Sequence, residues 1–313
     1  MKTSRVLIIS SLILLASSLF FMLFNSNGNW DFILPFRGKK LLLLLTVAYT
    51  IGVSTLLFQT LTNNPILTPS ILGFDSLYLL LQTILVFLLG GLGFTQLPIA
   101  NKFAFETLLM LGAALLLFRT LTKDNADIAR MLLIGVVFGV FFRSVNNLLQ
   151  RMIDPEEFAV AQSSSFASFN NANPTLLTIG IIIALLSSIW IWTQRHKLDV
   201  LMLGKHKAIG LGINYNRFSH QLLICCALLV SVSTALVGPI LFLGLLVCAI
   251  VNAISPTMQH AIRIPLTFII SAITLVLGQA VFEQLFKLQG VLSVVIEFLG
   301  GIVFIYLMLK KQK

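Results

Sequence analysis

The sequence predicts an all-α, polytopic membrane protein with about ten transmembrane helices. Its mean hydropathy is +0.98 and only 10% of its 313 residues are charged, so it lacks the polar surface that a soluble globule needs. Apolar runs close to the roughly 20 residues that cross a bilayer recur along the whole chain. We therefore expect residues 1–313 to form a single transmembrane domain.

Eight apolar runs are each long enough for one crossing. Residues 221–254 are too long for one, and we expect Gly238-Pro239 to divide them into two helices, because proline removes a backbone donor and clashes with the preceding turn. The first run exceeds a typical signal-peptide core and no A-x-A-like cleavage site follows it, so it predicts a helix of the mature chain. The eight runs are Val6–Phe24, Leu41–Phe58, Ile71–Gly90, Phe103–Phe118, Met131–Leu149, Leu176–Trp192, Ile264–Val281 and Val291–Leu309.

The distribution of Lys and Arg predicts the topology. Most of these bases fall in the tails and loops that are cytoplasmic if the N-terminus is inside, and insertion retains such residues on that side. Both termini are therefore expected in the cytoplasm. The net charge of +10 serves this topology, since the chain has no soluble domain to present a basic face, and we expect no nucleic-acid partner.

Two loops are longer than helix connections require. Residues 194–219, RHKLDVLMLGKHKAIGLGINYNRFSH, are basic and therefore expected in the cytoplasm. Good helix formers alternate there with glycines, which predicts short helices broken by turns and hence a docking surface. Residues 151–174 are acidic and then rich in Ser and Asn, which predicts a solvated extracytoplasmic loop.

Polar residues follow one face of the fifth predicted span. Arg143, Asn146, Asn147 and Gln150 recur at helical spacing, and such a stripe seldom faces lipid. It either holds helices together or lines a pathway or dimer contact. Glu297 lies at a similar depth in the last span. Because an unpaired charge there costs about 2.5 kcal/mol or more, we expect Arg143 and Glu297 to pair.

The sequence offers no catalytic or cofactor chemistry. No G-x-x-x-x-G-K-[ST] phosphate loop occurs, so the chain lacks the cradle that ATP hydrolysis requires. No acid, histidine or cysteine cluster has catalytic or metal-ligand spacing. We expect no enzyme activity and no cofactor bound by this chain, and any ATP must be used by a partner subunit. The four histidines are His196, His206, His220 and His260.

Three motifs follow one another along the chain. They are Gln59, Asn64, Pro65, Pro69 and Gly73; then Leu203, Gly204, Ala208, Leu211 and Gly212; then Gly238, Pro239, Ile240, Phe242, Gly244 and Leu245. In this order they are similar to the motifs of the iron-siderophore and vitamin B12 (FecCD-type) permeases of ABC importers, and the resemblance covers nearly the whole chain. The segment GFDSLY, from Gly73 to Tyr78, looks like the branch for catecholate or mixed siderophores such as anguibactin and petrobactin. The sequence departs from the family after Gly244, where Cys248 and Ala249 replace a Pro-His pair.

The resemblance implies a type II ABC importer permease fold in a bacterial inner (plasma) membrane, with a ferric siderophore as cargo. It implies three partners besides the lipid bilayer: ABC ATPase subunits, a second permease subunit that is identical or different, and an extracytoplasmic substrate-binding protein. It assigns ATPase coupling to Leu203, Gly204, Ala208, Leu211 and Gly212. It assigns binding-protein docking to Arg37 and Lys40; the family's further base, before the last helix, is not matched in register, although Lys287 lies nearby and is a candidate for it. It assigns the translocation pathway or gate to Asn64, Pro65, Pro69, Gly73, Arg143, Asn146, Asn147, Gly238, Pro239 and Glu297.

Several alternatives stay open at this point. Arg37 and Lys40 could simply extend their charges to the membrane interface. Asn64-Pro65 could be a plain turn between helices. The cargo could be haem or cobalamin within the same family. A proton-coupled secondary transporter, with Arg143 and Glu297 as its relay, is a rival of a different class.

Overall fold

The computed structural model describes residues 2–24, 30–122, 128–163, 166–170, 173–285 and 292–311. In these segments all regular elements are helical, and eight helices are long and apolar enough to span a membrane, with two shorter apolar helices beside them. The prediction of about ten apolar helices is confirmed. The elements are α1 (Lys2–Leu23), α2 (Trp30–Thr62), η1 (Pro69–Leu72), α3 (Phe74–Gln96), α4 (Ile99–Thr122), α5 (Ile128–Gln150), α6 (Pro155–Ser163), α7 (Pro174–Thr193), α8 (Arg195–Leu201), α9 (Lys205–Gly210), α10 (Tyr215–Val237), α11 (Leu243–Ile254), α12 (His260–Ala280), η2 (Val281–Leu285) and α13 (Leu292–Lys311).

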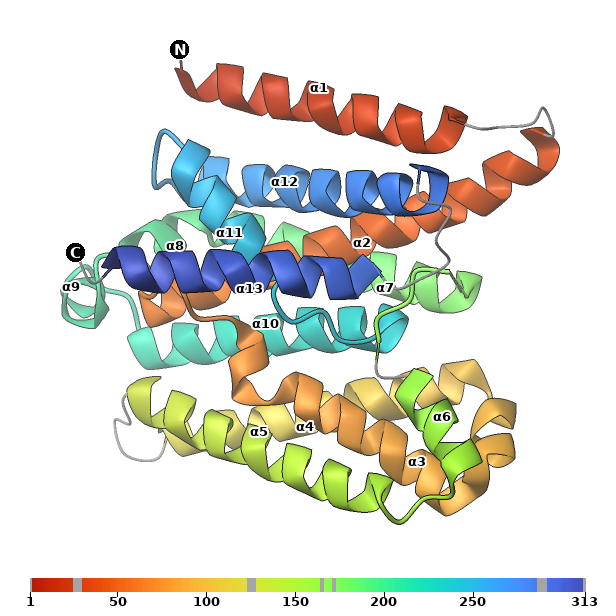
Figure 1. Cartoon of the computed structure of the whole chain (residues 1–313). Coiled ribbons are helices and arrows are strands. Elements are labelled where there is room, and N and C mark those ends of the chain that lie inside the picture. Colours follow the sequence, from red (N-terminus) through yellow and green to blue (C-terminus); the bar gives the residue numbers. More distant parts are fainter. Residues whose placement is uncertain are drawn as a thin grey trace.

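The long helices run roughly side by side, with α2 and α10 in the interior (Figure 1). In the membrane-spanning part of α2, 78% of the residues are buried, against 17% in α1 and in α5. α1 and α12 lie at one edge of the bundle and α3 to α6 lie at the other. α1 begins and α13 ends at the end of the bundle that carries α9.

The break at Gly238-Pro239 is confirmed. α10 ends at Val237, Gly238 adopts a φ of 98°, and α11 begins at Leu243. α11 has 12 residues, so it extends about 18 Å and cannot cross the roughly 30 Å hydrocarbon layer. Non-helical backbone inside a membrane protein is tolerated where protein or a water-filled cavity surrounds it. The break therefore brings irregular backbone and a helix N-terminus into the bundle.

Two expected boundaries differ from the structure. α2 begins at Trp30, well before the expected Leu41, so Arg37 and Lys40 lie within the helix. Within this extension the guanidinium of Arg37 donates to the carbonyls at the end of α1. The last carbonyls of an α-helix find no donor within the helix itself. The expected solvated loop contains α6, which packs against α3 where Gly90 interrupts the helical geometry. Glu157 of α6 accepts there from the backbone N–H of Gly91 at 3.2 Å.

Candidate functional site

The basic segment between α7 and α10 folds into two short helices, α8 and α9, as the alternation of helix formers and glycines predicted. α9 lies at the end of the bundle, beyond the spanning helices (Figure 1). Its Ala208 is fully buried, whereas the side chains of Leu203, Ile209 and Leu211 are 52%, 51% and 62% exposed. An exposed apolar patch rimmed by polar residues is typical of a protein interaction site. We name these three side chains the coupling patch.

Glycines shape both ends of α9. Gly204 before the helix and Gly212 after it have φ values of 94° and 84°, a region that side chains with a Cβ avoid. At the C-terminal end the Gly212 N–H donates to the Ile209 carbonyl at 3.0 Å, and the Ile213 N–H donates to the Ala208 carbonyl at 3.1 Å. This pair of bonds is the Schellman motif, which ends a helix and satisfies its last carbonyls. The predicted coupling glycines therefore hold the shape of the patch, and Ala208 holds it against the bundle.

The turn after α2 follows the Gln-Asn-Pro pattern seen in the sequence. Asn63 ends the helix with a φ of 49°, a left-handed conformation that Asn tolerates better than most residues. The Gln59 side chain donates to the Pro65 carbonyl at 2.7 Å, and the Asn64 side chain accepts from the Ile66 N–H at 3.1 Å. The Gln and Asn of the motif therefore close the turn from within.

The turn continues through η1, which starts at Pro69, to Gly73, where the backbone presses against α5. Gly73 has a φ of 86°, and a Cβ built on it would lie 2.7 Å from the Gly139 Cα. A Cβ on Gly135 would lie 3.0 Å from the Leu72 Cα. The glycine pair of α5 was missed in the sequence. Its i, i+4 spacing on one helix face was the available signal.

Several of the predicted pathway residues meet at one small cavity of about 130 Å³. Asp75 from the start of α3, Arg143 and Asn146 from α5, Pro239 from the break before α11 and Glu297 from α13 all line it. Asp75 is 5% exposed and Asn146 is 6% exposed, and each has a buried oxygen without a hydrogen-bond partner. The arrangement offers acceptor oxygens and one guanidinium inside a membrane protein, which is unusual enough to indicate a functional position.

The expected direct pair between Arg143 and Glu297 is not among the ion pairs that the structure shows for its described residues. Instead, Asp75 lines the same small cavity as Arg143 and Glu297. Asp75 was not singled out in the sequence, where it lies near the end of an apolar run. Arg143 and Asn147 are exposed on α5, whereas Asn146 is buried, so only part of the polar stripe faces outward from this chain. The remaining pathway residues, Asn64, Pro65, Pro69, Gly73 and Gly238, lie in the two irregular segments described above.

The expected docking bases are engaged inside the chain. Arg37 donates to the carbonyls of Phe21, Met22 and Phe24 at 3.1, 3.0 and 2.8 Å. Lys40 is 6% exposed, forms an ion pair with Glu283 and donates to the Asn170 side chain. Lys287 lies outside the described residues. The neighbouring Lys39 is exposed.

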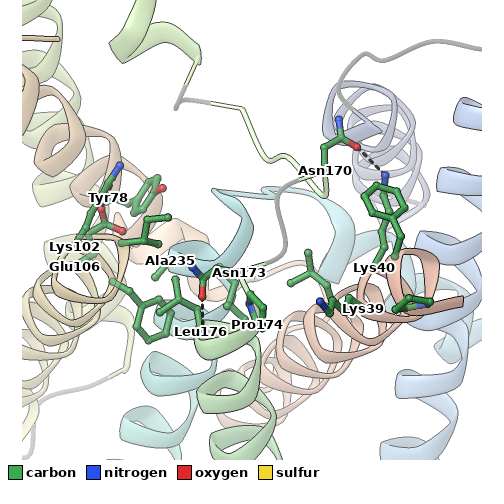
Figure 2. Close-up of a pocket in the computed structure, with 16 residues that line it drawn as sticks. Lys39, Lys40, Tyr78, Lys102, Glu106, Asn170, Asn173, Pro174, Leu176 and Ala235 are labelled. Carbon is green, nitrogen blue, oxygen red and sulfur yellow. Dashed lines mark hydrogen bonds and ion pairs between the residues drawn. The ribbon is translucent and has the colours of Figure 1, made fainter. Parts of the chain in front are cut away.

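Lys39 and Lys40 also line a cavity of about 680 Å³ between α2, α4, α7 and the end of α10 (Figure 2). Lys102 and Glu106 of α4 line the opposite side, with their charged groups 4.0 Å apart. The Lys102 ammonium also lies 3.6 Å from the centroid of the Phe94 ring. Sequence reasoning missed this cavity, since only the folded chain brings α2 and α4 together.

A match to the FecCD transport family covers residues 5–310. The petrobactin import system permease protein YclO of Bacillus subtilis is 48% identical, over 93% of this chain and 93% of that protein. The petrobactin import system permease protein FatC of Bacillus anthracis is 33% identical, over 88% of this chain and 78% of that protein. A solved inward-facing structure of a metal-chelate type ABC transporter superposes with a TM-score of 0.86, over 98% of this chain and 99% of that chain, at 20% identity.

Fold and family together define the class of protein: a multi-pass membrane permease of an ABC importer, which is a transport subunit and not an enzyme. The chain belongs to the FecCD transport family. The resemblance inferred from the three motifs is confirmed. Because the chain belongs to a family of ABC importer permeases, the alternative of a proton-coupled secondary transporter is no longer needed. ABC importers of this kind work with an ATPase and a binding protein, so these partners follow from the class.

Proposed function

We propose that this chain is the permease subunit of a petrobactin importer, which carries the ferric siderophore across the bacterial inner (plasma) membrane. The 48% identity to a petrobactin permease over 93% of both chains is the observation that carries this proposal. The relative at 33% identity is also a permease of a petrobactin import system. The catecholate branch indicated by the segment Gly73–Tyr78 is consistent with it.

ATP enters the mechanism through the coupling patch. A partner ATPase binds Leu203, Ile209 and Leu211, which are exposed at the tip of the bundle. Grooves beside this patch, lined by Gly212, Ile213, Asn214 and the start of α10, provide additional contact surface. ATP binding and hydrolysis then push on residues 203–214. α8 and α9 lie on the side where α1 begins and α13 ends, which supports a cytoplasmic location for both termini.

The pathway lies where the small cavity lined by Asp75, Arg143 and Glu297 opens toward a second permease subunit. α5 exposes Val137, Phe141 and the charged Arg143, and α13 exposes Phe298 and Ile302. An apolar face interrupted by a guanidinium is costly against lipid but suits a protein interface beside a hydrated passage. The passage is therefore formed by two subunits, with Asp75, Arg143 and Glu297 at its wall. The irregular segments at Asn64-Pro65 and Gly238-Pro239 are the parts of that wall that rearrange.

The binding protein docks at the opposite end of the bundle. Arg37 and Lys40 keep the helix ends of this surface in place through their internal bonds, and Lys39 offers an exposed charge next to them. Exposed rim charges chiefly accelerate association. We assign steering to Lys39 and a supporting role to Arg37 and Lys40, with Lys287 as a further candidate.

Cargo selection is tested in cells. A strain lacking the gene is supplied with radiolabelled iron as ferric petrobactin, as a ferric hydroxamate or as haem, and with labelled cobalamin in parallel. The proposal predicts that only uptake from ferric petrobactin falls, and that the gene restores it. Loss of haem or cobalamin uptake with petrobactin uptake intact would instead establish the other cargo of the same family.

A further inference from the structure

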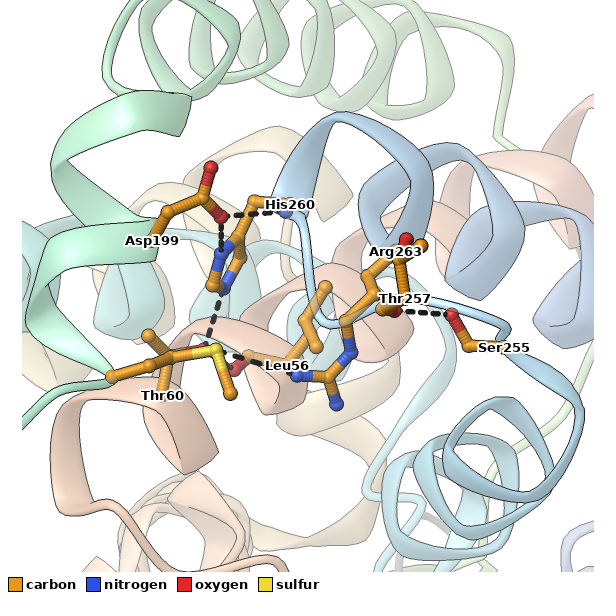
Figure 3. A network of polar contacts seen from close by, with 8 residues as sticks. Leu56, Thr60, Asp199, Ser255, Thr257, His260 and Arg263 are labelled. Carbon is orange, nitrogen blue, oxygen red and sulfur yellow. Dashed lines mark hydrogen bonds and ion pairs between the residues drawn. The ribbon is translucent and has the colours of Figure 1, made fainter. Parts of the chain in front are cut away.

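A chain of hydrogen bonds joins α8 to the ends of α12 and α2 (Figure 3). Asp199 Oδ1 of α8 accepts from the backbone N–H of His260 at 2.7 Å and lies 2.7 Å from His260 Nδ1. On the other side of the ring, His260 Nε2 lies 2.8 Å from the Thr60 hydroxyl of α2. One imidazole thus connects three elements that are far apart in the sequence.

The partners determine how the imidazole bonds. A carboxylate can only accept, so Nδ1 carries a hydrogen and donates to Asp199. In the neutral ring Nε2 then accepts from the Thr60 hydroxyl. The His260 side chain is 0% exposed, so water does not replace a lost partner. Removing either bond leaves a buried ring nitrogen unsatisfied, which is costly.

Thr60 has a second partner within reach. Its hydroxyl lies 2.9 Å from the Leu56 carbonyl of its own helix. A hydroxyl has one hydrogen to donate, so it can be given either to His260 or to Leu56. The hydroxyl therefore has two discrete arrangements, one that ties α2 to α12 and one that leaves α2 internally satisfied. Discrete arrangements of this kind are what a switching contact requires.

A second contact attaches α8 to α12 one turn further along. Arg263 is 4% exposed, donates to the Asn252 side chain of α11 and points at the Met202 sulfur, 3.7 Å away. Met202 follows α8 directly. α8 is therefore held to α12 at two points, and α12 is held to α11, the short helix behind the Gly238-Pro239 break.

Thr60 also lies next to the predicted gate. The adjacent residue, Gln59, bonds the Pro65 carbonyl and closes the turn after α2. α9, which carries the coupling patch, packs against α8 and α10. A displacement of α9 by a partner therefore acts directly on α8, and the bonds of His260 connect α8 to the end of α2.

We propose that Asp199, His260 and Thr60 form the positioning linkage that transmits movement of the coupling segment to the ends of α2 and α12. This inference rests on the proposed function, since it concerns how ATP use is converted into transport. The three residues touch neither cargo nor nucleotide. They act by keeping α8 in register with the two helices that lead to the irregular segments of the pathway.

The test uses the complete complex of permease, ATPase and binding protein in proteoliposomes, with ferric petrobactin uptake and ATP hydrolysis measured in the same vesicles. Thr60→Val removes the hydroxyl at constant shape, and Thr60→Ser is its matched control. Asp199→Ala removes both accepted bonds, and Asp199→Asn keeps an acceptor oxygen. We expect the ratio of cargo transported to ATP hydrolysed to fall roughly two- to tenfold in the Val and Ala variants, the range for one lost hydrogen bond.

The controls separate coupling from folding. Thr60→Ser and Asp199→Asn should retain the parental ratio, and the double variant Thr60→Val with Asp199→Ala should lose no more than either alone, because both break one chain. Equal ratios in all variants, even with lowered thermal stability, would show a purely structural contact and overturn the inference alone. Absence of uptake by the parental complex would overturn the proposed function and this inference with it.

Discussion

Gly73, at the start of α3, lies directly against Gly139 of α5, with no side chain between the two backbones. A Cβ on Gly73 would come within 2.7 Å of the Gly139 Cα, and one on Gly139 would come within 3.1 Å of the Gly73 Cα. This contact seats the end of the irregular segment that follows α2 on the helix that carries Arg143. It therefore joins the predicted gate to the polar face of α5.

Gly73→Ala should destabilise the permease strongly. The left-handed φ costs about 1–2 kcal/mol for a residue with a Cβ, and overpacking against α5 adds about 1–3 kcal/mol. Thermal unfolding in detergent measures the loss. Gly112→Ala in α4 is the matched control, since a Cβ there meets nothing within 4 Å, and it should leave the melting temperature unchanged or raised. Equal melting temperatures for the two variants would contradict the contact.

Gly212→Ala should weaken association with the ATPase while leaving membrane insertion intact. The substitution strains the Schellman motif at the end of α9 by about 1–2 kcal/mol and so displaces Leu211 in the coupling patch. Gly210→Ala is the control: that residue lies inside α9 with open space around it, where alanine favours the helix. Copurification with the ATPase measures the effect. A Gly212 variant that binds as well as the Gly210 variant would show that the patch does not need this turn.

The ion pair of Lys40 with Glu283 can be tested by exchanging the two charges. Lys40→Glu alone places two carboxylates together, and it should lower the free energy of unfolding by about 1.5–3 kcal/mol or more, the range for a hydrogen bond to a charged group. Adding Glu283→Lys should restore stability and binding-protein association. If Lys40 instead contacts the binding protein directly, the exchanged protein would be stable but would still associate slowly. Lys39→Glu, at an exposed position, should slow association at low salt without loss of stability.

Much of the architecture follows from run length alone. A helix needs a stretch of apolar residues to cross the bilayer, so the spans and the break at Gly238-Pro239 were predictable. The start of α2 was not, because its first residues include the charged Arg37, Lys39 and Lys40 and so do not belong to the apolar run. α6 was missed because residues 155–163 are too polar to resemble a span.

The functional residues also divide into those that could be recognised from a local sequence pattern and those whose contacts depend on the fold. Coupling residues of α9 are local in sequence and could be recognised together, although only the fold separates the inward Ala208 from the exposed leucines. The pairing of Arg143 with Glu297 was inferred from depth, but the fold brings Asp75 to both through the start of α3. His260 was set aside because it has no ligand spacing, and its bonds to Asp199 and Thr60 depend on three helices meeting.

Double-mutant cycles should show that Asp75 interacts with Arg143 in the small cavity that both residues line. We expect Arg143→Leu and Asp75→Asn to be non-additive in folded yield, with a coupling free energy of roughly 0.5–3 kcal/mol, because the guanidinium and the buried carboxylate line the same small cavity. The cycle between Arg143→Leu and Glu297→Leu should show weaker coupling. A larger coupling free energy in the cycle with Glu297 would support the direct pair expected from the sequence. Additive effects in both cycles would mean that Arg143 acts independently of both carboxylates.

The most direct test of the account is the initial rate of ferric petrobactin uptake into proteoliposomes that contain the permease and its ATPase. The rate is measured with and without ATP on the side of α9, and with and without the binding protein on the opposite side. The account predicts uptake only when both are present, and no effect of a protonophore. Uptake that persists without ATP and stops when a proton gradient is removed would contradict it.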